Sequence, residues 1–267
     1  MFHGSLTALI TPFRNGEVDE PAFQKFVDWQ IQEGTDALVP CGTTGESPTL
    51  SHGEHMRVVE LCIEAAGGRV PVIAGTGSNS TAEAIHLTRH AKDAGASAAL
   101  IVMPYYNKPT PEGQYRHFKA IHDAVDIPII IYNIPGRSVV DMSVETMAKL
   151  AIQKEFCLLS GEDATVMAFL AQGGDGCISV TANVAPRMLA DMHGAWRRGD
   201  LKAAMGINER LTPLHEALFC ESSPGPVKYA ANLLGHCQAD LRLPLCEIAD
   251  ASKQKVQRAL ASAGLVN

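Results

Sequence analysis

Tyr132, Asn133 and Arg137 follow an apolar run in the middle of the chain, and their side chains could bind or react with a small molecule. A phenol can act as an acid or a base, and a guanidinium can hold a carboxylate. The run from Pro128 to Ile131 is typical of a strand buried on both faces, and such strands belong to parallel sheets. The three polar side chains should then lie at the carboxyl end of a parallel strand, where barrels and doubly wound sheets hold their sites. Alone, Tyr132 is more often a packing residue and Arg137 a solvated surface charge.

The rest of the chain alternates patterns of strands and helices at roughly even spacing. Strands are predicted at residues 5–11, 36–41, 70–75, 98–103, from 128 onward, 156–160 and 177–180. Helices are predicted at residues 19–34, 51–67, 80–95, from 110 onward, 143–151, 188–196, 201–218, 226–234 and 248–263. Two of these helices should begin with capping boxes, Ser51 with Glu54 and Ser80 with Glu83.

This alternation predicts an α/β fold of the (β/α)8 TIM-barrel type, because repeated strand, helix and strand units form parallel sheets with right-handed crossovers. Only seven strands can be counted, and one βα unit is missing between Leu150 and Phe156. The loss should leave unpaired backbone groups on the two strands that flank it. We expect the barrel to occupy residues 1–199 and a C-terminal helical region to occupy residues 200–267.

The composition favours a protein that acts on small molecules. The chain has 267 residues and a net charge of -7 without a basic cluster, which argues against nucleic acid as a partner. Its seven cysteines form no Cys-x-x-Cys pair and no regular spacing with histidine, so we expect neither disulfides nor a metal site. No basic lead precedes the first apolar run, and no apolar segment approaches the ~20 residues of a membrane span. We expect a soluble cytoplasmic protein with no membrane partner and no cofactor.

Six motifs in order along the chain resemble the dihydrodipicolinate synthase family and together cover nearly the whole sequence. They are Gly-Thr-Thr-Gly-Glu-Ser at 42–47, Val-Ile-Ala-Gly-Thr-Gly at 72–77, Pro-Tyr-Tyr-Asn at 104–107, Tyr-Asn-Ile-Pro-Gly-Arg at 132–137, Leu-Ser-Gly-Glu-Asp at 159–163 and Gly-Asp-Gly-Cys-Ile-Ser-Val at 174–180. The resemblance implies a lyase that condenses pyruvate with L-aspartate 4-semialdehyde in the diaminopimelate route to lysine, as 4-hydroxy-tetrahydrodipicolinate synthases do. It also implies self-association as a dimer or tetramer.

The resemblance also implies which residues move protons. Joining pyruvate to an aldehyde needs a carbon nucleophile, which a lysine amine provides by forming a Schiff base with pyruvate. In a site that resembles this family, Tyr132 is the proton donor and acceptor and Thr43 relays the proton through its hydroxyl. Tyr106 would complete the relay, reaching in from a neighbouring subunit.

Substrate-binding residues follow from the same resemblance. Thr44 and the backbone of Ile178 would hold the pyruvate carboxylate, and Arg137 would bind the carboxylate of aspartate semialdehyde. Thr43 and Thr44 have an alternative role, which is hydrogen bonding within their own turn.

One part of the family's site has no counterpart in this sequence. The Schiff-base lysine of the family ends the sixth strand, in an Ile-Lys-Glu-Ala-Thr-like segment that is absent here. None of the ten lysines of this chain ends a predicted strand: Lys108 lies on a rim loop, Lys149 lies in a helix, and Lys154 precedes a strand. Three explanations remain open: an internal deletion in the gene, a paralogue that has abandoned the chemistry, and an enzyme whose nucleophile comes from elsewhere.

In lysine-regulated members of the family, the inhibitor lysine binds between subunits. The positions that match this pocket are Ser47, His52, His55, Asn79, Glu83 and Tyr105. Glu83 can pair with an ammonium group, and Asn79 and Tyr105 can hold the amino-acid head group. The alternatives are an ordinary helix face for His52 and His55 and a helix cap for Glu83.

Two rivals stand beside the synthase function. One is a catalytically inactive, truncated paralogue that binds lysine or pyruvate, or that associates with a complete paralogue. The other is a different pyruvate-dependent aldolase or lyase, such as a sialic acid or keto-acid lyase.

Overall fold

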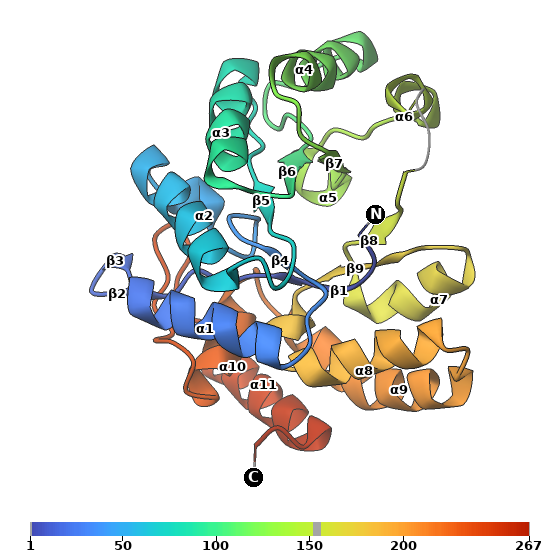
Figure 1. The fold of residues 1–267 in the computed structure, drawn as a ribbon. Coiled ribbons are helices and arrows are strands. Elements are labelled where there is room, and N and C mark those ends of the chain that lie inside the picture. The colour runs from blue at the N-terminus through green and yellow to red at the C-terminus, as the bar shows by residue number, and fades with distance from the viewer. Residues whose placement is uncertain (1, 152–155, 267) are drawn as a thin grey trace. The chain divides into compact units, whose positions relative to one another are not determined.

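The chain forms two compact units, and each is described here by itself. The structure is a computed structural model that describes residues 2–151 and 156–266 (Figure 1). Unit 1 comprises Met1–Pro71 and Cys157–Asn267, and unit 2 comprises Val72–Phe156. Each unit contains its own parallel sheet.

Unit 1 is built on a four-stranded parallel sheet in the order β4-β1-β9-β8. The strands are β1 (Gly4–Ala8), β4 (Ala37–Val39), β8 (Leu159–Ser160) and β9 (Gly176–Ser179). In the central strand β1, Leu6 pairs with Ala37 on one side and with Ile178 on the other. Every residue of β1 is buried, including the polar Ser5 and Thr7, as expected for a strand in the middle of a parallel sheet.

Helices cover this sheet and continue into a helical C-terminal region. They are α1 (Glu20–Gln32), α2 (His52–Ala66), α7 (Val166–Ala171), α8 (Pro186–Arg197), α9 (Leu201–Ala217), α10 (Gly225–Leu233) and α11 (Asp250–Ala263). The capping box of Ser51 and Glu54 at the start of α2 is confirmed. Helix α1 packs against α2, and α9 packs against both α8 and α11. A hairpin of β2 (Phe13–Arg14) and β3 (Glu17–Val18) was not expected from the sequence, nor was α7.

Unit 2 has a three-stranded parallel sheet in the order β5-β6-β7 and a core of its own. Its elements are β5 (Ile73–Gly75), α3 (Thr81–Ala94), β6 (Ala98–Val102), α4 (Pro111–Ala124), β7 (Ile129–Tyr132), α5 (Pro135–Ser138) and α6 (Val144–Leu150). Ile101 and Met103 from the sheet side pack with Phe118 and Ile121 of α4 in one buried cluster. Phe118 and Ile121 are three residues apart, which places them on one face of α4, and that face is buried.

The strands that flank the missing βα unit differ from the prediction. Strand β7 was expected to be buried on both faces, but all of Ile129–Tyr132 are only half-buried. The strand expected at residues 156–160 is reduced to Leu159–Ser160. Both are the last strands of their sheets, so the chain that would cover them in a complete barrel is absent. Each of the two strands has one strand partner within its own unit, and seven parallel strands are present among the described residues.

The second predicted capping box forms only in part. The Ser80 side chain accepts from the Glu83 backbone N–H at the start of α3, as expected. The Ser80 backbone N–H, however, donates to Ser78 Oγ at 3.0 Å. The Ser78 hydroxyl in turn donates to the Glu83 carboxylate, which leads that side chain away from the cap position.

Two further properties concern the described residues alone. None of their helices is long and apolar enough to cross a membrane. Four of the seven free cysteines are buried, Cys157 and Cys220 are half-buried, and Cys246 is exposed.

His193 on α8 should make the stability of the protein depend on pH. Its side chain is 1% exposed, and burial lowers its pKa to about 4, against about 6.5 in an unfolded chain. Between these values the unfolded chain binds the proton and the folded chain does not. The free energy of unfolding should therefore fall by about 2 to 3 kcal/mol from this residue as the pH drops from 7.5 to about 4.5.

The measurement is urea unfolding of the protein and of a His193→Gln variant at both pH values. The variant should lose less stability on acidification, since Gln does not titrate. An equal loss in both proteins would contradict the assignment.

Candidate functional site

The loop between β4 and α2 carries Thr43 and Thr44, and its shape is imposed by its surroundings. Cys41 and Glu46 have positive φ angles of 56° and 55°, a conformation that costs energy for residues other than glycine. Thr11 Oγ1 donates to the Gly45 carbonyl at 2.7 Å. A Cβ atom at Gly45 would lie 3.0 Å from the Leu9 carbonyl oxygen and 3.1 Å from the Cys41 nitrogen, so a larger residue would have to displace this backbone.

A buried ion pair anchors this loop to the C-terminal helices. Glu46 Oε1 lies 2.5 Å from Lys228 Nζ on α10, and both side chains are 0% exposed. Glu46 Oε2 accepts from the Arg242 backbone N–H at 3.2 Å, and Lys228 Nζ donates to the Asp240 carbonyl at 2.8 Å. Burial lowers the pKa of Lys228, and the Glu46 charge opposes this shift. The sequence did not indicate this pair, because its members lie on loop and helix patterns far apart in the chain.

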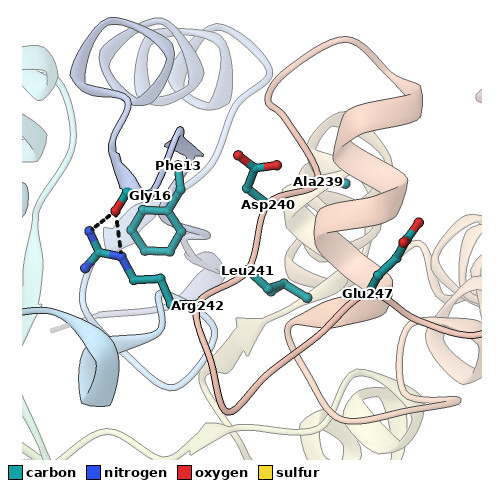
Figure 2. Close-up of a pocket in the computed structure, with 7 residues that line it drawn as sticks. All are labelled: Phe13, Gly16, Ala239, Asp240, Leu241, Arg242 and Glu247. Atoms are coloured by element: carbon teal, nitrogen blue, oxygen red, sulfur yellow. Dashed lines mark hydrogen bonds between the residues drawn. The ribbon is translucent and has the colours of Figure 1, made fainter.

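Phe13 and Arg242 extend this cluster to the protein surface. Lys228 Nζ lies 4.0 Å and Arg242 Cζ 4.3 Å from the centre of the Phe13 ring, so the ring contacts two cations. Arg242 also donates to the carbonyl of Gly16, as Figure 2 shows, and pairs with Glu54 at 2.5 Å. Its guanidinium thereby joins the hairpin, α2 and the C-terminal segment.

The pocket drawn in Figure 2 lies beside this cluster and has a volume of about 430 Å³. It is lined by Phe13, Gly16, Ala239, Asp240, Leu241, Arg242 and Glu247. None of the site residues predicted from the sequence lines it. We therefore place the candidate site at the strand ends and not in this pocket.

Thr43, Thr44 and Ile178 lie at the same edge of the sheet in unit 1. The two threonines follow the carboxyl end of β4, and Ile178 lies within β9. Because β4 and β9 both run parallel to β1, their carboxyl ends point the same way. Thr43 is half-buried and Thr44 is 4% exposed. This arrangement can present a hydroxyl and backbone donors to a small carboxylate.

A buried carboxylate fixes the turn that follows Ile178. Asp163, which is 1% exposed, accepts from Ser179 Oγ at 2.5 Å and from the backbone N–H groups of Val180 and Thr181 at 3.0 and 3.1 Å. Thr181 Oγ1 also lies 2.8 Å from Nδ1 of the buried His215. Sequence reasoning named Asp163 only as the end of a motif and missed this supporting role.

The other predicted catalytic and substrate-binding residues lie in unit 2. Tyr132 ends β7, and its carbonyl accepts from the Met103 N–H at 3.0 Å. Arg137 lies on α5 and is exposed. Tyr106 is 89% exposed and has a φ of 70°. The six predicted residues are therefore divided, three to each unit.

Asn133 follows Tyr132 and holds the loop after β7 in place. Its Nδ2 donates to Asp141 at 2.7 Å, and its Oδ1 accepts from the Met142 N–H at 3.3 Å. The sequence indicated Asn133 as a rim residue, and these bonds give it a structural role.

The residues that match the lysine pocket are also divided between the units. In unit 2, burial and then the Glu83 charge raise the pKa of Tyr105. Asn107 Nδ2 donates to the Asn79 carbonyl at 2.9 Å, which ties together the loops after β5 and β6. In unit 1, Ser47 begins the short 3-10 helix Ser47–Thr49, His52 begins α2, and His55 is buried one turn later.

No lysine lies in a described strand or directly after one. Lys154, which was expected to precede a strand, lies outside the described residues. Lys228 is fully buried, but it lies on α10 and pairs with Glu46. The described strand ends therefore offer no amine for a Schiff base.

Comparison with known proteins gives consistent matches. The chain matches the model of the dihydrodipicolinate synthetase family over residues 1–153 and 148–263. A 4-hydroxy-tetrahydrodipicolinate synthase from Rhodospirillum centenum is 63% identical over 290 positions that cover 100% of both chains. The structure of the chloride-inhibited dihydrodipicolinate synthase from Acinetobacter baumannii complexed with pyruvate is 42% identical, has a TM-score of 0.96 and covers 100% of both chains. The dihydrodipicolinate synthase from Cyanidioschyzon merolae with lysine bound is 36% identical, has a TM-score of 0.95 and covers 99% of both.

These matches confirm the predicted α/β fold of the TIM-barrel type and locate the missing segment. The alignment with the Rhodospirillum centenum relative has 290 positions and this chain has 267 residues, so at least 23 positions (290 - 267) have no residue here. The two matches to the family model meet at residues 148–153. The predicted gap between Leu150 and Phe156 lies at the same place.

Breaking the buried ion pair should destabilise the protein. Lys228→Met leaves the Glu46 carboxylate buried without its cation, and we expect the free energy of unfolding to fall by about 3 to 5 kcal/mol. The double variant Glu46→Gln with Lys228→Met should lose less, because no unpaired charge remains. Urea unfolding of the three proteins measures both effects.

Lys253→Met is the matched control. Its partners Glu247 and Asp250 are exposed, so its loss should change stability by at most about 1 kcal/mol. Equal stability of the Lys228→Met and Lys253→Met variants would show that the buried pair has no structural importance.

Proposed function

Because the chain belongs to the dihydrodipicolinate synthetase family, we propose that its function is that of a 4-hydroxy-tetrahydrodipicolinate synthase, the condensation of pyruvate with L-aspartate 4-semialdehyde. This lyase reaction belongs to the diaminopimelate route to lysine. The main support for the proposal is that residues matching the family's strand-end residues are present at the ends of the strands that this chain has. A relative at 42% identity has been solved with pyruvate.

Pyruvate would bind through its carboxylate at the edge of the unit 1 sheet. Thr44 supplies a hydroxyl and a backbone N–H after β4, and the backbone of Ile178 supplies a further contact from β9. The support for this assignment is that both strands end at the same edge and that Asp163 fixes the turn after β9. Arg137, which is exposed, would meet the carboxylate of the semialdehyde.

Proton transfer is assigned to Tyr132, Thr43 and Tyr106. Two phenols and one alcohol hydroxyl in series can pass a proton between solvent and the reacting carbon atoms. Tyr106 projects from a loop with 89% of its surface exposed, which suits a side chain that enters the site of a second copy. We therefore include a homo-oligomer, a dimer or tetramer, in the proposal.

The Schiff base requires an amine that attacks the ketone carbon of pyruvate and releases water. Under the synthase function this amine has to come from a lysine outside the described strand ends.

A second candidate function is favoured by the missing segment: a protein that binds pyruvate or lysine, or associates with a complete paralogue, without turnover. In both cases lysine would bind as a regulator at Ser47, His52, His55, Asn79, Glu83 and Tyr105.

The support for lysine binding is partly structural. Glu83 provides a carboxylate for an ammonium group. Burial and then the Glu83 charge raise the pKa of the Tyr105 phenol, which stays a neutral donor. A relative at 36% identity has been solved with lysine bound.

We also place the protein in the cytoplasm, since seven free cysteines suit a reducing compartment.

Borohydride reduction tests the synthase function. Incubation with pyruvate and sodium borohydride should add one reduced pyruvate to a lysine, because reduction traps a Schiff base as a stable amine. Intact mass measures the adduct, and peptide mapping identifies the residue. If no adduct forms although calorimetry shows that pyruvate binds, the synthase function is refuted and the binding function without turnover is supported.

Thr44→Val tests the carboxylate site independently of turnover. Valine keeps the shape of the side chain and removes the hydroxyl, so we expect pyruvate to bind about tenfold or more weakly, the effect of one hydrogen bond to a charged group. Isothermal titration calorimetry gives the dissociation constants. Thr49→Val, on the same loop but outside the proposed site, should bind pyruvate like the unmodified protein, and equal affinity of both variants would refute the role of Thr44.

A further inference from the structure

The outer edge of β7 exposes a defined set of backbone groups. The Ala99 N–H donates to the Pro128 carbonyl at 2.9 Å, and the Met103 N–H donates to the Tyr132 carbonyl at 3.0 Å. Residues 128, 130 and 132 therefore direct their backbone groups toward β6, since these groups alternate along a strand. The N–H and C=O groups of Ile129 and Ile131 point to the opposite side.

Within unit 2, no described residue pairs with that side of β7. The unit 2 sheet ends with β7, whose one strand partner among the described residues is β6. Exposed sheet edges in natural proteins are usually protected by charged side chains, proline or bulges. Strand β7 contains none of these within Ile129–Tyr132, and its residues remain half-buried.

Unit 2 also exposes large apolar side chains in the sequence that follows β7. Val139 is 69%, Val144 79% and Phe156 60% exposed, although each is a residue type that is usually buried. All three lie in sequence between the end of β7 and the end of the unit.

The missing segment indicates what fits this edge. At least 23 positions of the Rhodospirillum centenum relative have no residue here, and the break in the family match lies at residues 148–153. An average strand and an average helix together need about 17 residues, so the absent length suits one strand and one helix. All strands of unit 2 are parallel. A strand that continues this sheet would therefore also run parallel to β7.

We propose that the outer edge of β7 is an acceptor site for a parallel β-strand donated by a second polypeptide. The occupant is an extended segment of a different chain, of the kind that the longer relatives carry at this position. It bonds to the N–H and C=O groups of Ile129 and Ile131. Strand pairing at this edge does not require turnover, although the segment that the family carries here also ends in its Schiff-base lysine.

The probe is a fluorescent synthetic peptide with the sequence of the Rhodospirillum centenum relative that aligns with the gap. We expect saturable binding to the full chain with one peptide per chain, measured by fluorescence anisotropy. Hydrogen–deuterium exchange should slow at the amides of Ile129 and Ile131 and not at that of Ile130, which already faces β6. Lack of saturable binding, or protection elsewhere without protection of β7, would overturn the proposal.

Ile131→Pro removes one outward N–H and leaves the bonds to β6 intact. It should weaken peptide binding about tenfold, while Ile130→Val, which changes no backbone donor, should bind like the unmodified chain. A peptide with proline at alternate strand positions tests the same bonds without altering the protein, and it should not bind. Equal binding of the original and proline peptides would refute strand pairing. Concentration-dependent self-association that is abolished by Ile131→Pro would identify a second copy of this chain as the occupant and refute the donated strand.

Discussion

The ion pair between Glu46 and Lys228 joins two parts of unit 1 that are distant in sequence. It fixes the loop that carries Thr43 and Thr44 against α10, in a place from which water is excluded. A charge buried in this way is tolerated only with its partner, so neither side chain can be replaced alone without a large cost. The C-terminal helices are therefore a support for the strand-end loop as well as a cover for the sheet.

Arg242 and Asp163 also fix loops of unit 1 through charged side chains. Arg242 reaches from the C-terminal segment to Glu54 and Gly16, and Asp163 collects three donors at the end of β9. In each case a charged side chain holds backbone that a strand or helix does not hold. The strand ends that carry the site depend on such bonds because loops lack a hydrogen-bond ladder of their own.

Much of this fold could be predicted because buried parallel strands and amphipathic helices leave clear patterns. The apolar run of β6 and the capping box of α2 are examples. The β2–β3 hairpin has two-residue strands, and α7 has six residues, which is too short for a periodic pattern. Glu46 and Lys228 could not be paired from sequence, since their contact depends on how α10 packs. The half-burial of β7 depends on a neighbour that the chain does not have, so its apolar run indicated more burial than exists.

The distribution of the cysteines has a practical consequence for spectroscopy. Burial raises the pKa of the Cys41, Cys62 and Cys177 thiols, which keeps them protonated and shielded from alkylating reagents at neutral pH. Maleimide dyes or nitroxide spin labels should instead react at Cys246 and, more slowly, at Cys157 and Cys220. Cys157 stands two residues before β8, so a label there would report on the open end of that sheet without any engineered mutation.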